Sequence, residues 1–228
     1  MKKILVMLLM CCPLICAAQS EWEAPTAAAQ SNEAKAEKPK AAKKDKTADE
    51  APDPSSIKDW EYIKEGAVPE VGGKVVFAYD IDLPGKTAQQ VYDLTYTALD
   101  SLAHTDSQIS SGIALVNRKE HIIAARYQEW LEFSKSFISL DRTKFNYTII
   151  ATCTDGRLHL TLDRIAYNYE EDRQGGMKTT AEKWIADKYA VNKKRTKLVN
   201  GPAKFRRKTI DRKNAIFRYI ATKVKPTA

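Results

Sequence analysis

The chain has 228 residues, 43% of them hydrophobic, with four cysteines and a formal net charge of +8. Three of the cysteines lie in the first 16 residues, so removal of an N-terminal signal would leave Cys153 alone and exclude an internal disulfide. From Lys178 onward the chain has 16 Lys and Arg against 3 Asp and Glu, a local charge of +13. A basic end on an otherwise acidic protein favours either an anionic partner or an internal match of opposite surfaces.

The N-terminus has the pattern of an export signal. Two lysines precede an apolar run over residues 4–15, and the run ends in small residues up to Ala18. About twelve apolar residues are too few for a transmembrane helix, which needs roughly 20. We therefore expect a signal peptide over residues 1–18 and an exported protein, periplasmic or secreted, with no transmembrane segment in its mature form. A lipoprotein anchor is less favoured, because these cysteines lack the small preceding residue usual in lipoprotein signals.

The next residues have the composition of a linker. Alanine, lysine, glutamate and proline dominate, and Trp22 is the one large apolar side chain before Ile57. Such a segment buries too little apolar surface to offset the entropy of ordering it. We expect a disordered tether over residues 19–57, followed by a single folded domain over residues 58–228 that is long enough for a sizeable core.

The folded domain begins with a predicted strand and a predicted helix. Apolar and polar side chains alternate over residues 74–81, as in a half-buried strand. Thr87 and Gln90 have the spacing of a capping box. Apolar residues then recur at helical spacing, which predicts a helix over residues 87–102.

Four further strands are predicted in the middle of the domain. The segments are rich in β-branched and aromatic residues, and Asp155-Gly156 is typical of a hairpin turn between the last two. In the third segment Phe145, Tyr147 and Cys153 share one face, so Cys153 is expected in the core. The four segments are residues 113–117, 121–133, 144–153 and 157–169.

The remainder of the chain predicts a charged loop and helices. The loop covers residues 170–178, a helix follows over residues 181–190, Gly201-Pro202 interrupts the chain, and a last amphipathic helix covers residues 211–223. The order is β-α-β-β-β-β-α-α. It predicts the α+β class: a two-layer sandwich in which helices cover one face of a five-stranded antiparallel sheet.

Several segments together resemble a known family. They are Val75–Phe77, Leu83–Lys86, Thr154–Arg157, Ile165–Tyr167 and Lys204–Asp211. This combination is similar to domain of unknown function 4468, a family of exported bacterial proteins with a TATA-binding-protein-like fold built from one β-α-β4-α unit. The resemblance covers about residues 70–225 and implies that fold. It implies no catalytic residues, and a fold shared with a DNA-binding protein is no argument for DNA binding.

The sequence predicts no catalytic or metal-binding constellation. Cys153 falls on the core face of its strand, and His159 falls on the opposite face of the neighbouring strand. The histidines lie in separate segments without ligand spacing, and the acidic run 170–172 lacks the alternating oxygen ligands of a hard-cation loop. We therefore expect no catalytic residue, no metal and no cofactor.

The basic segment near the carboxyl terminus is the best candidate for a binding site. Paired arginines suit phosphate or carboxylate groups, and an anion there would also gain from the start of the last helix. A single aromatic residue, Phe205, is too few to stack single-stranded nucleic acid. The alternative is a charged surface neutralised by the protein's own acidic residues. The predicted anion-binding residues are Lys204, Arg206, Arg207, Lys208 and Arg212.

These observations favour a non-enzymatic binding or structural module of the bacterial cell envelope. Its partner would be an envelope protein, an anionic lipid or a glycan, and no nucleic acid. Two alternatives stay open: a hydrolase with an unidentified site, and anionic lipid or glycan binding through the basic segment. An enzyme should show a pocket with converging polar groups of perturbed pKa, whereas a shallow sheet face carrying Thr148, Thr152 and Thr161 would favour the module.

Overall fold

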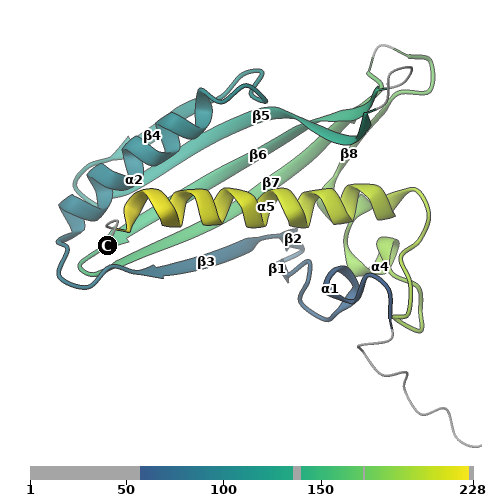
Figure 1. Ribbon diagram of the computed structural model, residues 1–228, viewed down its shortest axis with the longest axis horizontal. Helices are drawn as coiled ribbons and strands as arrows, with labels where there is room; N and C mark the ends of the chain where they lie inside the picture. The colour runs from purple at the N-terminus through teal and green to yellow at the C-terminus, as the bar shows by residue number, and fades with distance from the viewer. Residues whose placement is uncertain (1–56, 136–139, 172, 226–228) are drawn as a thin grey trace, which may run out of the picture. The chain divides into compact units, whose positions relative to one another are not determined.

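A computed structural model describes residues 57–135, 140–171 and 173–225 of the chain (Figure 1). The predicted signal peptide and all but the last residue of the predicted linker lie outside these ranges, so both stay predictions. The domain predicted over residues 58–228 is described over nearly its whole length.

One layer of the domain is a six-stranded antiparallel sheet (Figure 1). Its strands follow the order β3-β7-β6-β5-β4, and β8 pairs with the part of β7 beyond β3. A separate small sheet pairs β1 (Glu70–Val71) with β2 (Lys74–Val75). The strands of the main sheet are β3 (Phe77–Asp82), β4 (Gly112–Asn117), β5 (Ile122–Lys135), β6 (Leu140–Thr154), β7 (Arg157–Tyr169) and β8 (Met177–Thr180).

The α+β class and the antiparallel sheet are confirmed, but the sheet has one strand more than the five predicted. The extra strand, β8, starts inside the segment predicted as a charged loop. Four residues are too few to show the alternation that marks a strand in a sequence. They pair because residues 166–169 of β7 extend past β3 and offer a free edge.

Two long helices form the second layer and lie on one face of the sheet (Figure 1). The first, α2 (Ala88–Ala103), begins at the predicted capping box: the Thr87 hydroxyl accepts from the backbone of Gln90, and the Gln90 side chain accepts from the backbone of Thr87. The second is α5 (Pro202–Val224). Within the described residues, no helix has the length and apolar character needed to span a membrane. The short helices are α1 (Trp60–Ile63), α3 (Ala181–Trp184) and α4 (Asp187–Ala190).

The two helices predicted at the carboxyl end have different bounds in the structure. The predicted helix 181–190 is split into α3 and α4, and the carbonyl of Ile185 between them accepts a hydrogen bond from Arg206 instead of continuing one helix. The last helix begins nine residues earlier than predicted, after Gly201 at a φ of 88° and with Pro202 in its first turn. Basic residues in the first turns hid the apolar face of this part of the helix in the sequence.

The core lies between the sheet and the two long helices. The side chains of Phe145, Tyr147, Ile149 and Cys153 on β6 are all buried and face this layer, as predicted. Cys153 is 2% exposed, and burial raises the pKa of its thiol to about 11. Near neutral pH the thiol is therefore protonated and behaves as a small apolar side chain.

The opposite face of the sheet is not covered by any helix of the described residues (Figure 1). Thr152 and Thr161 are partly exposed on this face. Thr148, four residues before Thr152 on β6, is 6% exposed. An antiparallel sheet with one face on the core and one toward solvent explains the alternation of the strands. This uncovered face is within reach of a ligand.

Candidate functional site

The predicted anion-binding residues are built into the interior of the domain rather than displayed on it. Arg206 has an exposed fraction of 0%. Its Nε donates to the carbonyl of Tyr62 at 2.6 Å, and its guanidinium also donates to the carbonyl of Ile185 and to Asp187. Burial lowers the pKa of Arg206, and the contact with Asp187 opposes that shift. The side chain thus joins α5 to α1 and to the start of α4.

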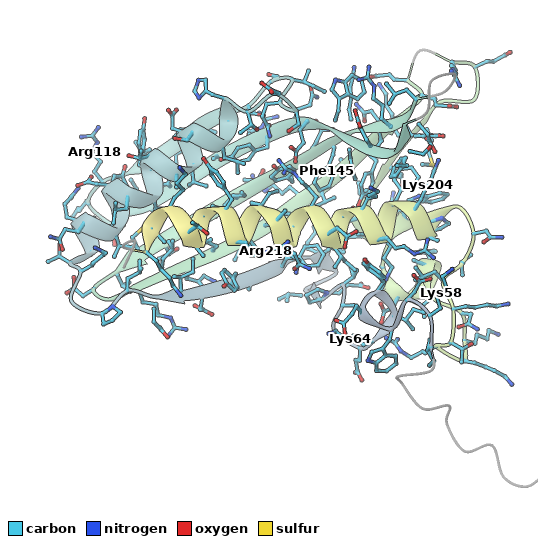
Figure 2. The ribbon with its side chains drawn as sticks, in the orientation of Figure 1. Lys58, Lys64, Arg118, Phe145, Lys204 and Arg218 are labelled. Carbon is cyan, nitrogen blue, oxygen red and sulfur yellow. The ribbon has the colours of Figure 1, made fainter. Side chains whose placement is uncertain are left out.

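Lys204 is also held by contacts within the chain (Figure 2). Its Nζ lies 2.8 Å from Asp141 and 3.0 Å from the hydroxyl of Tyr169, and it stands 4.7 Å from the ring centre of Phe133. Burial alone would lower the pKa of Lys204, but the hydrogen bonds from Asp141 and Tyr169 raise it. Lys204 therefore stays charged and connects the start of α5 to the sheet.

Two further arginines of α5 form bidentate pairs with carboxylates. Arg207 donates to Asp59 at 2.9 and 2.6 Å, and Arg212 donates to Glu129 at 2.8 and 2.6 Å. Glu129 is 1% exposed, so this second pair is buried on the carboxylate side. Three more groups donate to Glu129: the side chains of Ser107, Gln108 and Tyr147.

Lys208 is the one predicted residue that no hydrogen bond or ion pair engages among the described residues. It borders a shallow surface together with Asp106 and Asp211. Anion binding through the basic segment stays a prediction, but the intramolecular partners of the other four residues count against it. For those four, neutralisation by the protein's own acidic groups describes the structure better.

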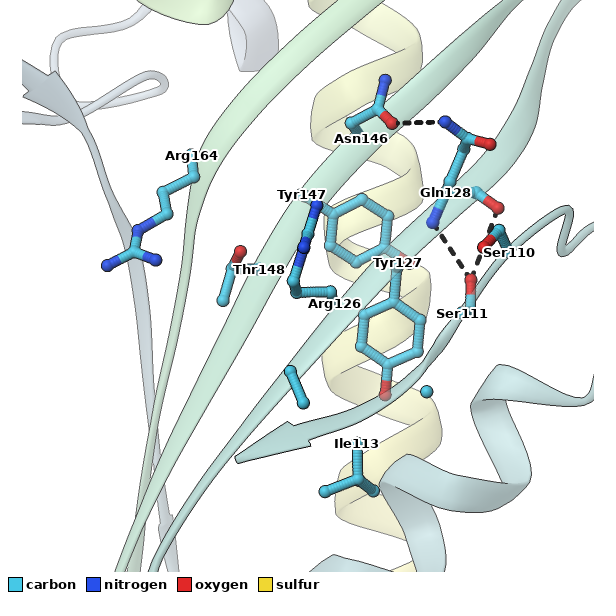
Figure 3. Close-up of a pocket in the computed structure, with 12 residues that line it drawn as sticks. Ser110, Ser111, Ile113, Arg126, Tyr127, Gln128, Asn146, Tyr147, Thr148 and Arg164 are labelled. Carbon is cyan, nitrogen blue, oxygen red and sulfur yellow. Dashed lines mark hydrogen bonds between the residues drawn. The ribbon is translucent and has the colours of Figure 1, made fainter. Parts of the chain in front are cut away.

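A different set of polar residues comes together in a hollow of about 580 Å³ on the uncovered face (Figure 3). Figure 3 looks onto this face, with α5 behind the sheet, so the hollow opens away from the helix layer. Its volume lies within the roughly 300–1,000 Å³ of small-molecule sites. Among the described residues that line it, the only charged side chains are two arginines. The residues that shape it include Ser111, Arg126, Gln128, Asn146, Thr148 and Arg164.

The two arginines, Arg126 and Arg164, lie on either side of Thr148 (Figure 3). Arg126 on β5 is directly opposite Thr148 on β6. Arg164 belongs to a β-bulge of β7, where residues 164 and 165 together face Tyr147. Its φ of 52° is left-handed, a conformation that non-glycine residues rarely adopt. Among the described residues, neither arginine has a hydrogen bond or an ion pair.

The other end of the hollow is uncharged. The amide of Gln128 donates to Asn146 Oδ1 at 2.8 Å, and the backbone N–H of Gln128 donates to the hydroxyl of Ser111 at 3.0 Å (Figure 3). Asn146 in turn donates to the carbonyl of Ala166. These contacts fix the orientation of both amides and leave the Gln128 Oε1 acceptor toward solvent without a protein partner among the described residues.

Two tyrosines close the floor of the hollow but direct their hydroxyls to the helix side. The rings of Tyr127 and Tyr147 stack with centres 5.1 Å apart. Tyr127 donates to the carbonyl of Leu99 at 2.8 Å, and Tyr147 donates to Glu129 at 3.0 Å. Burial raises the pKa of both phenols far above their usual range. The phenols therefore belong to the core and supply no acid or base to the hollow.

Comparison with known proteins shows the family. A family described as a domain of unknown function (DUF4468) with TBP-like fold matches residues 77–168. A DUF4468 family protein from Bacteroides ovatus ATCC 8483, known from a crystal structure, is 40% identical in sequence. The match covers 75% of this chain and 96% of that chain, with a TM-score of 0.69. The chain belongs to the DUF4468 family.

A second solved structure shares the fold of this DUF4468 protein. It is a TBP-like protein from Parabacteroides distasonis ATCC 8503, 18% identical, with a TM-score of 0.55 over 69% of this chain and 96% of that chain. A search of curated proteins found no match. The predicted family and TBP-like fold are therefore confirmed, and neither comparison names a ligand.

The histidines of the DUF4468 domain lie apart from the hollow. His159 Nδ1 is 2.9 Å from Asp80, and its side chain is 44% exposed, as predicted for a half-exposed strand histidine. The hydrogen bond from His159, followed by that from Arg157, lowers the pKa of Asp80. The described residues contain no group of three or more His, Cys, Asp or Glu that could hold a metal ion.

The sequence contained one signal of this hollow that the prediction did not use. Leu158, Leu160 and Leu162 alternate, but the next buried residue is Ile165 rather than residue 164. A shift of one residue in the alternation is the mark of a β-bulge. It singles out Arg164, whereas nothing in the sequence distinguishes Arg126 from any other polar strand residue.

Proposed function

We propose that this DUF4468 protein is a non-enzymatic binding module of the bacterial cell envelope, and that it contacts its ligand through the uncovered face of the sheet. One observation carries the proposal: that face has a hollow of about 580 Å³ whose charged side chains, Arg126 and Arg164, have no partner among the described residues. Unsatisfied cationic groups in a concave surface are what a ligand of opposite charge requires.

The composition of the rest of this face agrees with binding. Half-buried threonines such as Thr152 and Thr161 provide hydroxyls and methyl groups without large flexible side chains. A surface of this kind can contact a ligand at a small entropic cost, because few rotamers are lost. A shallow sheet face that carries threonines is the feature that, from the sequence, would favour a binding module over an enzyme.

The chemistry of the hollow favours binding over hydrolysis. Nucleophilic catalysis needs a nucleophile and a base within hydrogen-bond reach. The Ser111 hydroxyl donates to the side-chain amide oxygen of Gln108 and accepts from the backbone N–H of Gln128, and neither amide takes or gives a proton near neutral pH. We therefore propose that the hollow binds its ligand without a chemical reaction.

The envelope location rests on the predicted signal peptide over residues 1–18. Processing after Ala18 would release a mature chain that begins at Gln19, in the periplasm or outside the cell. Mass analysis of the N-terminus of protein from the native host tests this part. An intact Met1 or an acylated cysteine would contradict it.

Retention of envelope material tests the binding role. The purified protein is immobilised, solubilised envelope extract is passed over it, and retained glycan and protein are quantified. We expect retention by the unmodified protein and loss of retention in Thr152→Arg, which places a long side chain on the uncovered face, on the same strand as Thr148.

Thr97→Arg is the matched control, because Thr97 is exposed on α2 in the helix layer. Both variants add the same side chain and charge to the surface. Equal retention by Thr97→Arg and Thr152→Arg would contradict a role for the sheet face, as would the absence of any retained material.

A further inference from the structure

We propose that the hollow binds a carboxylate or sulfate group carried by a hydroxylated small molecule, the chemistry of an acidic sugar. The oxyanion would lie between Arg126 and Arg164 above Thr148, and the hydroxylated body would extend toward Asn146 and Gln128. This inference rests on the proposed binding role of the uncovered face and names the class of ligand.

The charge of the hollow indicates an anion. Arg126 and Arg164 are like charges in one concavity, and among the described residues no carboxylate pairs with either of them. Three arginines of α5 differ, because Arg206, Arg207 and Arg212 each have a carboxylate partner at 2.6 Å. Other arginines without a hydrogen bond or an ion pair among the described residues, such as Arg118, lie outside the hollow, whereas Arg126 and Arg164 line it together and leave its positive charge without a counter-charge.

The nearest acidic residue does not fill it. Asp163 precedes Arg164 and is opposite Thr148 in the strand register. Its Oδ1 is buried without a hydrogen-bond partner, and burial raises the pKa of the carboxyl, with the Arg164 charge opposing that shift. No ion pair joins the Asp163 carboxyl to Arg164, and Asp163 is not among the described residues that line the hollow.

The spacing of the strands suits one oxyanion. Arg126, Thr148 and residue 163 are consecutive partners across β5, β6 and β7. Neighbouring strands lie about 4.8 Å apart, so the backbones that bear the two arginines are about 10 Å apart with a small threonine between them. Two long guanidinium side chains that rise from either side of a short one can enclose a group the size of a carboxylate. Each guanidinium can then form paired hydrogen bonds to it.

The backbone at Arg164 also points to function. A non-glycine residue in the left-handed region is strained, and no hydrogen bond or ion pair of the Arg164 side chain compensates for that strain among the described residues. Glycine would fit the same bulge without strain. An arginine there is explained by what its side chain does in the hollow, because bulges next to sites re-aim side chains.

The uncharged end of the hollow supplies partners for hydroxyl groups. Gln128 Nε2 uses one N–H on Asn146, which leaves its second N–H and its Oε1 for a ligand. A sugar hydroxyl both donates and accepts, so an adjacent amide donor and acceptor match it. Neighbouring charged and amide groups therefore select a molecule that combines one oxyanion with hydroxyls.

Isothermal titration of the purified protein tests the inference with three probes: galacturonic acid, galactose 6-sulfate and galactose. We expect the first, the second or both to bind, and galactose to bind at least about tenfold more weakly, because it lacks the charge-assisted hydrogen bonds. Preference for the first or second probe identifies carboxylate or sulfate as the natural group. Absence of binding by both charged probes up to about 10 mM overturns the inference.

Variants locate the site. Arg126→Gln and Arg164→Gln should each weaken the charged probe about tenfold, and melting curves close to that of the unmodified protein would show that both variants fold. Arg118→Gln is the matched control, because Arg118 is exposed in the β4–β5 turn, unpaired among the described residues and outside the hollow (Figure 2). Equal affinities in all three variants would show that the charged probe does not bind at Arg126 and Arg164, and would overturn the proposed site.

The outcome is separable from that of the proposed function. If Thr152→Arg abolishes retention of envelope material while neither charged probe binds, the uncovered face is a binding surface and the ligand class inferred here is wrong. If a charged probe binds at the arginines but no envelope material is retained, the site is correct and the envelope-binding role is wrong.

Discussion

Two groups of arginines in this protein have opposite environments. Arg206, Arg207 and Arg212 lie on α5, close together in the sequence, and each is held by carboxylates or carbonyls of distant segments. Arg126 and Arg164 are 38 residues apart in the sequence, line the same hollow of the uncovered sheet face, and have no hydrogen bond or ion pair among the described residues. Charge density along a sequence therefore says little about the availability of that charge.

The contrast follows from where each group lies relative to the core. Arg206 is fully buried and Arg212 faces the buried carboxylate of Glu129, so an unpaired charge there would be costly and partners must be present. The arginines of the sheet face point to solvent, which stabilises them until a ligand arrives. The first group should control stability and the second should control binding.

The largest expected effect is on stability, from Arg206→Met. Methionine retains much of the apolar length but leaves Asp187 Oδ1 and two carbonyls without the Arg206 donor, although Arg195 still donates to Asp187 Oδ2. We expect a loss of about 3–5 kcal/mol in the free energy of unfolding, typical for breaking a buried charged network. Denaturant unfolding measures it. A loss below about 0.5 kcal/mol, the usual range for a surface substitution, would remove the distinction between the two groups.

The second effect concerns the pair of Glu129 and Arg212. Glu129→Gln keeps the shape of the side chain but removes the charge that Arg212 faces, and it adds N–H donors toward Tyr147. We expect destabilisation by about 1.5–3 kcal/mol, the worth of hydrogen bonds to a charged group. Thermal unfolding of Arg126→Gln provides the comparison. If that variant lost as much, Arg126 would be structural after all.

The third prediction has the opposite sign. Arg164→Gly places glycine at a φ of 52° and removes no hydrogen bond or ion pair of the described residues. We expect unfolding stability to rise by up to about 1 kcal/mol, because a left-handed backbone strains any residue with a Cβ. Binding of the charged probe should weaken in the same variant. Lower stability would mean that the arginine has a structural role on the sheet.

The sequence was sufficient for the α+β class, the family, the capped helix after Thr87 and the buried position of Cys153. Each of these predictions depends on a short motif or on a hydrophobic periodicity within one segment, and the periodicity arises because one face of that segment packs on the core. It was insufficient for β8, whose pairing depends on how far β7 extends past β3. The sequence was also insufficient to predict that Lys204, Arg207 and Arg212 are paired within the protein. Their partners Asp141, Asp59 and Glu129 lie between 63 and 148 positions away in the chain.

The smallest expected effect is a dependence of stability on pH. The hydrogen bond from Arg207 lowers the pKa of Asp59, and burial opposes that shift. A depressed pKa in the folded state means that the pair stabilises the protein above the unfolded value, about 3.9 for Asp, and that this contribution is lost as pH falls through the folded value.

Arg207→Gln should therefore be less stable than the unmodified protein at pH 7, by no more than about 1 kcal/mol because Arg207 is 36% exposed. The difference should narrow below about pH 4. Unfolding curves across this range measure it. A difference that is the same at pH 3 and pH 7 would show that the ion pair contributes nothing.

The most direct test of the two environments is the NMR signals of the arginine Nε–H groups during a titration with galacturonic acid or galactose 6-sulfate. We predict that the signals of Arg126 and Arg164 shift with saturation, while those of Arg206 and Arg212 are slow to exchange with solvent and do not move. Shifts confined to the arginines of α5, with none at Arg126 and Arg164, would contradict it.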